Sequence, residues 1–331
     1  MSQANKISDA VPPTLGHIIG QKRACQQLKI SLDSYFNQRA MTSEELAHPH
    51  TLLIGPAGCG KSMLSALIAR ELGANLHEEL AQNIIGPGHL QGLLMMAEPG
   101  DCVFVDELHE LPPMVQTTLY RALEEGRLFL GRERKPFNLP PLTFIGATTE
   151  TYALAKPLRD RFKIVLQLTH YEPAELAELV RQRATALNWP VTDEAIEGIA
   201  ARGRNTPRLA LRLLEAARRH QVAENGAAIG KEHLERMCQV EGYDQLGLDI
   251  AERRYLDLLR EGPVRLNIIA TQMSLPRKTV EKVIESELIR LGLVTKTAEG
   301  MRVLTPLGTS HLKGTSFIHD EEPFNECPKA E

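Results

Sequence analysis

The chain has 331 residues, of which 43% are hydrophobic and 24% charged, and its formal net charge is −4. A chain of this length and composition can bury two or three hydrophobic cores, which excludes a disordered protein. The negative balance also argues against a protein that coats nucleic acid over its whole surface, although a local basic face stays compatible with it.

Targeting and disulfide signals are absent from the sequence. The first thirteen residues are polar and contain no apolar core of a secretory signal. No apolar run approaches the ~20 residues that a membrane helix needs, so we expect no membrane partner. The five cysteines form no C-x-x-C pair, which argues against a disulfide framework or a zinc site and favours the cytoplasm.

Residues 14–168 predict an α/β domain with a parallel sheet. Short β-rich runs alternate there with stretches long enough for helices, which is typical of a sheet covered on both faces. The expected strands are Thr51–Ile54, 102–105, 143–146, 164–168 and, more weakly, 75–77. A helix is expected over Lys61–Leu72, because apolar residues recur at helical spacing and Gly73 follows.

The rest of the chain predicts two smaller domains. Residues 169–247 show only helical periodicity, which indicates a small helical domain. Residues 248–313 show three helical patterns and then a hairpin over 293–305, which is the outline of a winged helix. Residues 1–13 and 314–331 lack periodicity, so we expect them to be disordered.

A phosphate-binding loop is indicated at residues 55–62 (GPAGCGKS), between an apolar strand and a helix. Glycines allow the backbone N–H groups to face the phosphates, and the helix N-terminus adds a positive dipole. Lys61 would add a charge at the phosphates, and the hydroxyl of Ser62 would bind Mg²⁺. We therefore expect ATP and Mg²⁺ as ligands.

Two carboxylates follow the apolar strand that begins at Cys102. Asp106 stands at its carboxyl end, where open α/β sheets bind their ligands, and Glu107 comes next. Asp106 would hold Mg²⁺, and Glu107 would act as the general base on the attacking water. Together with the phosphate loop, this order of residues predicts an ATP hydrolase.

Beyond these two motifs, the chain resembles the AAA+ ATPases and, within them, the RuvB family of branch-migration motors. The resemblance covers residues 15–312, and it rests on segments 106–111 (DELHEL), 146–149 (GATT), 157–162 (PLRDRF), 206–208 (TPR) and 262–264 (GPV). It implies an AAA+ domain, a helical lid and a C-terminal winged helix. It also implies a homohexameric ring that hydrolyses ATP on double-stranded or branched DNA.

The resemblance assigns roles to residues outside the two motifs. Thr148 matches the sensor-1 position, with Thr149 as the alternative. Arg161 matches the arginine finger that completes the site of the neighbouring subunit, with Arg159 as the alternative. Arg208 matches sensor 2. The implied nucleotide-binding set is Ile19, Gly58, Cys59, Gly60, Lys61, Ser62, Met63, Tyr171 and Arg208.

The winged-helix region carries the expected DNA contact. Residues 249–313 contain eleven Lys/Arg and eight Asp/Glu, which gives a charge of +3 in a chain that is negative overall. Lys296 and Arg302 flank the turn of the hairpin, where they could contact backbone phosphates without reading sequence. A winged helix can also dock a protein, so an ATPase that remodels or loads a protein partner is the alternative function.

The sequence departs from the family pattern in four places. The hairpin near residues 128–141, which docks the loading partner RuvA in relatives, is shorter. Glu150 replaces an arginine, residues 11–13 (VPP) replace a basic segment, and 298–301 (AEGM) lacks arginines. The segment replaced at 11–13 contacts nucleotide in relatives. The ATPase prediction is compatible with all four departures, whereas they weaken the branch-migration prediction.

Overall fold

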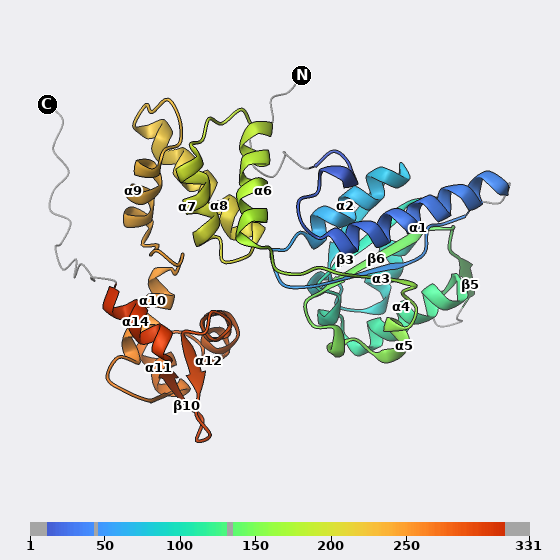
Figure 1. Ribbon diagram of the computed structural model, residues 1–331. Helices are drawn as coiled ribbons and strands as arrows, with labels where there is room; N and C mark the ends of the chain where they lie inside the picture. The colour runs from blue at the N-terminus through green and yellow to red at the C-terminus, as the bar shows by residue number, and fades with distance from the viewer. Residues whose placement is uncertain (1–11, 43–45, 131–134, 315–331) are drawn as a thin grey trace, which may run out of the picture. The chain divides into compact units, whose positions relative to one another are not determined.

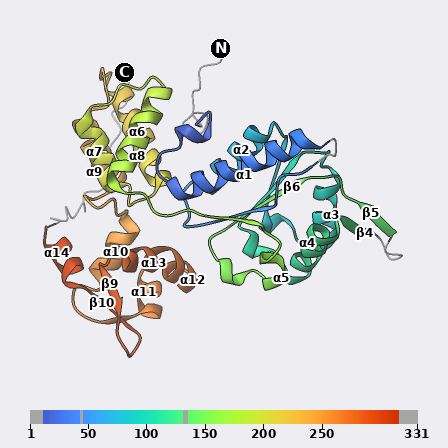
Figure 2. The same ribbon diagram turned by 45° about the vertical axis from the view of Figure 1, so that its right-hand side comes forward.

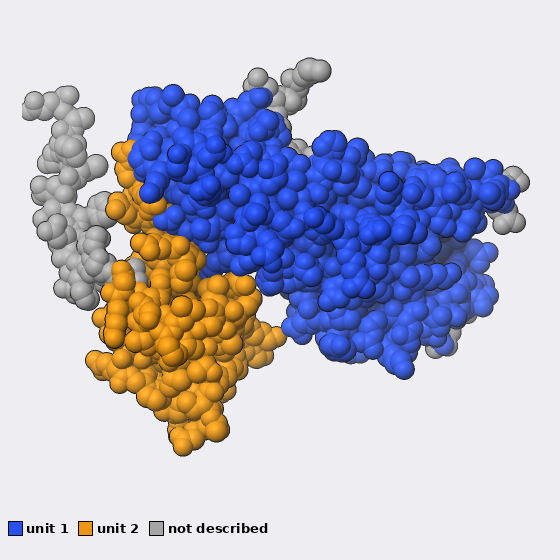
Figure 3. Space-filling model, viewed as in Figure 1, with its two compact units in different colours: residues 1–234 blue, residues 235–331 orange. Residues whose placement is uncertain are grey.

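The computed structural model describes residues 12–42, 46–130 and 135–314, and the chain forms two compact units, residues 1–234 and 235–331 (Figure 3). The expected disordered ends, 1–13 and 314–331, lie outside the described residues except at 12–13 and 314. Among the described residues, no helix combines the length and the apolar character needed to cross a membrane.

The first unit is built on a parallel five-stranded sheet in the order β2-β3-β6-β1-β7. Its strands are β1 (Thr51–Ile54), β2 (Leu76–Leu80), β3 (Cys102–Asp106), β6 (Thr143–Thr148) and β7 (Ile164–Gln167). All five expected strands are present, and the predicted α/β class is confirmed. β1 and β3 both pair with β6, so the phosphate loop and Asp106 leave the same edge of the sheet.

Helices cover both faces of this sheet (Figures 1 and 2). One face carries α1 (Lys22–Met41) and α2 (Lys61–Leu72), and the other carries α3 (Pro87–Met95), α4 (Pro113–Glu125) and α5 (Lys156–Arg159). Short 3-10 turns connect them at Leu15–His17, Ala81–Asn83, Leu108–Glu110 and Thr151–Ala153. The core on the second face includes Val103, Val105, Phe144, Leu90 and Leu119, all fully buried.

A β-hairpin projects from α4. Its strands, β4 (Arg127–Leu130) and β5 (Lys135–Asn138), pair antiparallel, and the tip at 131–134 lies outside the described residues. The hairpin whose shortening we noted in the sequence is therefore present as a two-stranded ladder.

A helical bundle follows the sheet. It comprises α6 (Pro173–Ala186), α7 (Asp193–Arg202), α8 (Pro207–Ala223) and α9 (Lys231–Glu241). A capping box between Glu172 and Glu175 starts α6, with Pro173 at its first position, where a missing N–H costs nothing. The boundary between the compact units falls inside α9, whereas the domain boundary expected at 247–248 stays a prediction.

The second unit contains the winged helix. Its elements are α10 (Ile250–Leu258), β8 (Val264–Arg265), α11 (Leu266–Gln272), α12 (Arg277–Thr279), a π-helical stretch η5 (Val280–Glu285), α13 (Ser286–Arg290), β9 (Val294–Lys296), β10 (Met301–Leu304) and α14 (Pro306–Gly314). The expected hairpin turns at Gly300, whose φ of +75° suits glycine. The sequence did not reveal the third strand β8 or the helix α14.

Candidate nucleotide site

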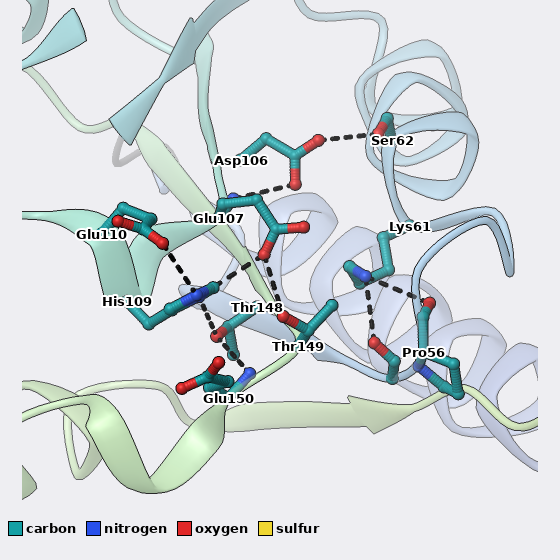
Figure 4. Close-up of polar contacts among 11 residues, drawn as sticks. Pro56, Lys61, Ser62, Asp106, Glu107, His109, Glu110, Thr148, Thr149 and Glu150 are labelled. Atoms are coloured by element: carbon teal, nitrogen blue, oxygen red, sulfur yellow. Dashed lines mark hydrogen bonds and ion pairs between the residues drawn. The ribbon is translucent and has the colours of Figure 1, made fainter. Parts of the chain in front are cut away.

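The phosphate loop joins β1 to α2 as the sequence predicts. Gly58 and Gly60 adopt left-handed φ values of +77° and +96°, which residues with a Cβ rarely adopt. The Lys61 ammonium donates hydrogen bonds to the carbonyl oxygens of Gly55 (3.0 Å) and Pro56 (3.2 Å), as Figure 4 shows. Burial lowers the pKa of Lys61, and the carboxylates of Glu107 and Asp106 oppose that shift.

The two carboxylates lie across from the loop at the end of β3. The Ser62 hydroxyl donates to Asp106 Oδ2 at 3.0 Å, so two oxygen groups of the kind that Mg²⁺ prefers face each other. Glu107 has a left-handed φ of +50°, and its backbone N–H donates to Asp106 Oδ1 at 2.9 Å. Such a backbone is uncommon outside glycine, and conformations of this kind are concentrated at functional sites.

Thr148 and Thr149, at the end of β6, form hydrogen bonds with different groups. The side chain of Thr148 is fully buried, and its hydroxyl accepts from the Glu150 N–H at 3.0 Å and bonds to His109 Nδ1 at 3.0 Å. The exposed Thr149 donates instead to Glu107 Oε2 at 3.2 Å (Figure 4). Thr149, the alternative for sensor 1, is the threonine that contacts Glu107, so the geometry favours it over Thr148, and the sensor-1 assignment stays a prediction.

His109 links these groups. Its Nδ1 lies 3.4 Å from Glu107 Oε2, and its Nε2 lies 3.5 Å from Glu110 Oε1. The ring therefore lies between Glu107 and the buried hydroxyl of Thr148 (Figure 4). Although His109 belongs to the segment that carried the resemblance, the sequence analysis assigned it no role.

The helical bundle contacts the phosphate loop through the start of α8. The backbone N–H of Arg208 donates to Gly58 O at 3.3 Å, and a Cβ at Gly58 would lie only 2.9 Å from Cβ of Arg208. Glycine at this position thus permits both the left-handed turn and the close approach of α8. This contact brings the expected sensor 2 to the loop.

A cavity of about 200 Å³ lies between the loop and the bundle. The predicted residues that line it are Gly58, Gly60, Lys61, Ser62, Met63, Asp106, Glu107, Tyr171 and Arg208. The structure thus gathers nearly the whole expected nucleotide set around one space. Ile19 and Cys59 do not line this cavity; Cys59 is buried at 1% exposure beneath the loop, with its side chain in the core.

The resemblance further implies that residues 18–21 and Tyr171 hold the base, and this segment lies beside Tyr171. Gln21 and Thr169 exchange two hydrogen bonds, of 2.7 and 3.0 Å, and a Cβ at Gly20 would lie 3.0 Å from the Tyr171 ring. Burial raises the pKa of Tyr171 to about 12, so its hydroxyl stays protonated. Ile19 is half-buried in the same segment, and its contact with a base stays a prediction.

Arg183 on α6 is a lining residue that the sequence analysis missed. Its side chain is only 8% exposed. The sequence did contain a signal, because Arg183 falls at helical spacing on the apolar stripe of Leu176, Leu179 and Val180. A charged residue on a buried stripe requires a group that binds its charge, and helical periodicity alone does not identify that group.

Arg161 does not line this cavity. Its guanidinium pairs with Glu124 and stacks over the Tyr120 ring at 5.2 Å. It borders a different groove of about 780 Å³, which α1 and the segment before β1 help to form. Arg159, the alternative finger, stacks over the exposed Tyr152 ring at 5.7 Å. Neither arginine belongs to the nucleotide cavity of its own subunit.

Arg302, one of the two expected DNA contacts, is buried in the winged helix. This side chain is 8% exposed, and its Nε donates to Glu285 Oε2 at 2.7 Å, while Glu285 is fully buried. The Tyr255 hydroxyl donates to the same oxygen at 2.8 Å, and the Lys296 ammonium lies 2.7 Å from Glu285 Oε1. Arg302 thus neutralises a buried carboxylate, whereas Lys296 shares that carboxylate but is partly exposed, so the geometry favours Lys296 for the DNA contact, which stays a prediction.

Comparison with known families matches the chain along nearly its whole length. The family described as "Holliday junction DNA helicase RuvB P-loop domain" matches residues 11–168. The "RuvB AAA lid domain" matches residues 171–242, and the "RuvB C-terminal winged helix domain" matches residues 245–313. All three matches are to parts of one kind of protein, in the order found here.

Individual relatives of the chain are RuvB proteins as well. The "Holliday junction branch migration complex subunit RuvB" of Anaeromyxobacter sp. (strain K) is 37% identical over 311 residues, covering 91% of this chain and 89% of the relative. The solved Thermotoga maritima RuvB Holliday junction branch migration motor is 32% identical, with a TM-score of 0.78, over 92% of this chain and 98% of that one. The Aeropyrum pernix ORC2 protein, at 16% identity and a TM-score of 0.56, shares only the fold.

Proposed function

The chain belongs to the RuvB family, and on that premise we propose that it is a Holliday junction branch-migration motor, driven by ATP hydrolysis in a homomeric ring. The observation that carries the proposal is the single cavity that gathers the phosphate-loop lysine, the Ser62–Asp106 pair and Glu107. The matches to a DNA helicase P-loop domain and to a RuvB winged-helix domain support the same proposal.

Within the cavity, each group has a chemical task. Lys61 and the loop N–H groups would bind the β- and γ-phosphates, and Glu107 would take a proton from the water that attacks the γ-phosphorus. Thr149, bonded to Glu107, would orient that carboxylate and the water. Mg²⁺, held by Ser62 and Asp106, would neutralise phosphate charge when bound.

The position of Arg161 supports the proposal that subunits share their nucleotide sites in a ring. Because it borders a groove away from its own nucleotide cavity, it would act on the γ-phosphate bound to the adjacent subunit. Its partners, Glu124 and Tyr120, hold the guanidinium in place on the surface. Loss of such a finger lowers the hydrolysis rate by about 10³–10⁵. Six subunits are expected from the family resemblance.

The winged helix would contact the DNA backbone. With Arg302 neutralised by Glu285, the exposed cations Arg277 and Lys278 and the partly exposed Lys296 are the candidates for phosphate contacts. Such contacts suit a motor that tracks along duplexes of any sequence. A RuvA-like loading partner is also proposed, with the β4–β5 hairpin as its docking element.

A four-way junction assay tests the proposal. The purified chain, with ATP, Mg²⁺ and a RuvA protein, should convert a labelled junction with homologous arms into two duplexes. Glu107→Gln should bind the junction but leave it unresolved. If the wild type hydrolyses ATP yet never moves the junction, at any salt concentration and with or without the partner, the branch-migration proposal fails and a protein substrate becomes the better explanation.

A further inference from the structure

Arg183 is a buried cation that faces the nucleotide cavity without a partner. Its side chain is 8% exposed and lines the cavity with Lys61 and the phosphate loop. Within the part of the chain that the structure describes, it forms no hydrogen bond or ion pair with the protein. Burial lowers the pKa of Arg183, and no carboxylate opposes that shift.

The other buried arginines of the described residues are satisfied by the protein. Arg302 pairs with Glu285, and Arg202 donates to Gly198 O at 3.3 Å. A guanidinium taken from water without an anion or acceptors costs several kcal/mol of folding free energy, in order of magnitude. Arg183 thus differs from Arg202 and Arg302 in having no protein partner among the described residues, and it lies at a ligand cavity.

We propose that Arg183 donates hydrogen bonds to the phosphate oxygens of the bound nucleotide, and so binds the lid helix α6 to the ligand. The inference rests on the proposed ATP site and adds a contact to it. A phosphate is favoured over the base because only an anion neutralises the buried charge, and a planar guanidinium matches phosphate oxygens in pairs. Arg208 on α8 and Arg183 on α6 would then give the lid two cations.

Arg183→Met tests this contact, because methionine keeps an unbranched chain of similar length without charge. Calorimetric titration of the full-length protein should show ADP and ATP binding weakened at least tenfold. Adenosine should bind within twofold of its wild-type affinity. The urea midpoint of the nucleotide-free variant should equal or exceed that of the wild type, because an unpaired buried charge has been removed.

Arg181→Met is the matched control. Arg181 belongs to the same helix but is exposed and pairs with Glu178 and Asp193, so its replacement should leave the affinity for all three ligands unchanged. Arg183→Lys, which keeps a cation but loses the fork, should weaken ADP and ATP binding less than methionine does, with an unchanged urea midpoint. It supplies the comparison if the methionine variant does not fold.

The outcomes separate the two proposals. If the wild type binds ADP and ATP but Arg183→Met binds them equally well, Arg183 does not touch the nucleotide and the inference is overturned. If adenosine binding falls as much as ATP binding, the phosphate assignment is overturned. A wild type that binds no nucleotide at all would remove the proposed function itself.

Discussion

The two threonines at the end of β6 allow a sharp test, because one hydroxyl reaches Glu107, the proposed general base, and the other does not. Replacement by valine removes each hydroxyl while preserving the shape of the side chain. Thr149→Val deletes the 3.2 Å hydrogen bond to Glu107, and Thr148→Val deletes the buried bonds to His109 and the Glu150 N–H. The two variants should therefore fail in different ways.

The expected magnitudes follow from exposure and charge. A hydrogen bond to a charged group contributes about 1.5–3 kcal/mol, so its loss in the transition state lowers kcat about ten- to hundredfold. Thr149 is exposed, so the unfolding free energy should change by less than about 0.5 kcal/mol. Thr148→Val leaves buried polar groups unsatisfied and should cost about 1–3 kcal/mol of unfolding free energy, with a smaller loss of kcat.

Two measurements decide whether Thr148 or Thr149 supplies the hydroxyl that orients the water. Phosphate release at saturating ATP gives kcat, and urea unfolding gives stability, with Thr149→Ser as the control that retains a hydroxyl. If Thr148→Val abolishes hydrolysis at wild-type stability while Thr149→Val hydrolyses normally, our assignment of the water-orienting hydroxyl is wrong.

Three further outcomes are expected. Lys61→Ala should weaken ATP binding at least tenfold in a calorimetric titration, because the cation of the phosphate loop is lost; unchanged affinity would contradict that role. Glu285→Gln should destabilise the winged helix by about 3 kcal/mol in urea unfolding followed by circular dichroism, because two cations then lose their buried carboxylate; an unchanged curve would refute the pairing. Burial would raise the pKa of Glu285, but hydrogen bonds from Arg302, Lys296 and Tyr255 hold that pKa below the ordinary value of a glutamate. Because the folded-state pKa is depressed, the stabilisation should be complete above the pKa of the unfolded state and lost as the pH falls through the folded-state pKa, a loss that Glu285→Gln should not show.

The elements set by local sequence were predictable. The helix over Lys61–Leu72 begins and ends as expected, because apolar spacing defines it and Gly73 closes it with a left-handed φ of +66°. The strands preceding the phosphate loop and Asp106 were equally clear, because fully buried parallel strands read as continuous apolar runs. The two motifs therefore located the nucleotide site before any geometry was known.

Side-chain partners across long sequence distances were not predictable. Arg302 looked like a surface cation beside a turn, but the strand pairing of β10 directs it toward Glu285, seventeen positions earlier in the chain. Thr148 and Thr149 are chemically identical, and only the alternation of side chains at the end of β6 decides which one reaches Glu107. Arg183 became a candidate ligand residue only when the structure placed it in the lining of the same cavity as the phosphate loop.

The central claim is that the ATP bound by one subunit is hydrolysed with Arg161 of the next. Mixing Glu107→Gln with Arg161→Ala subunits measures this most directly, because a mixed ring contains some interfaces with both an intact glutamate and an intact finger. Each variant alone should be inactive, and phosphate release should reappear in the mixture. If mixed rings form, as labelled subunits would report, and no phosphate is released, the shared site does not exist.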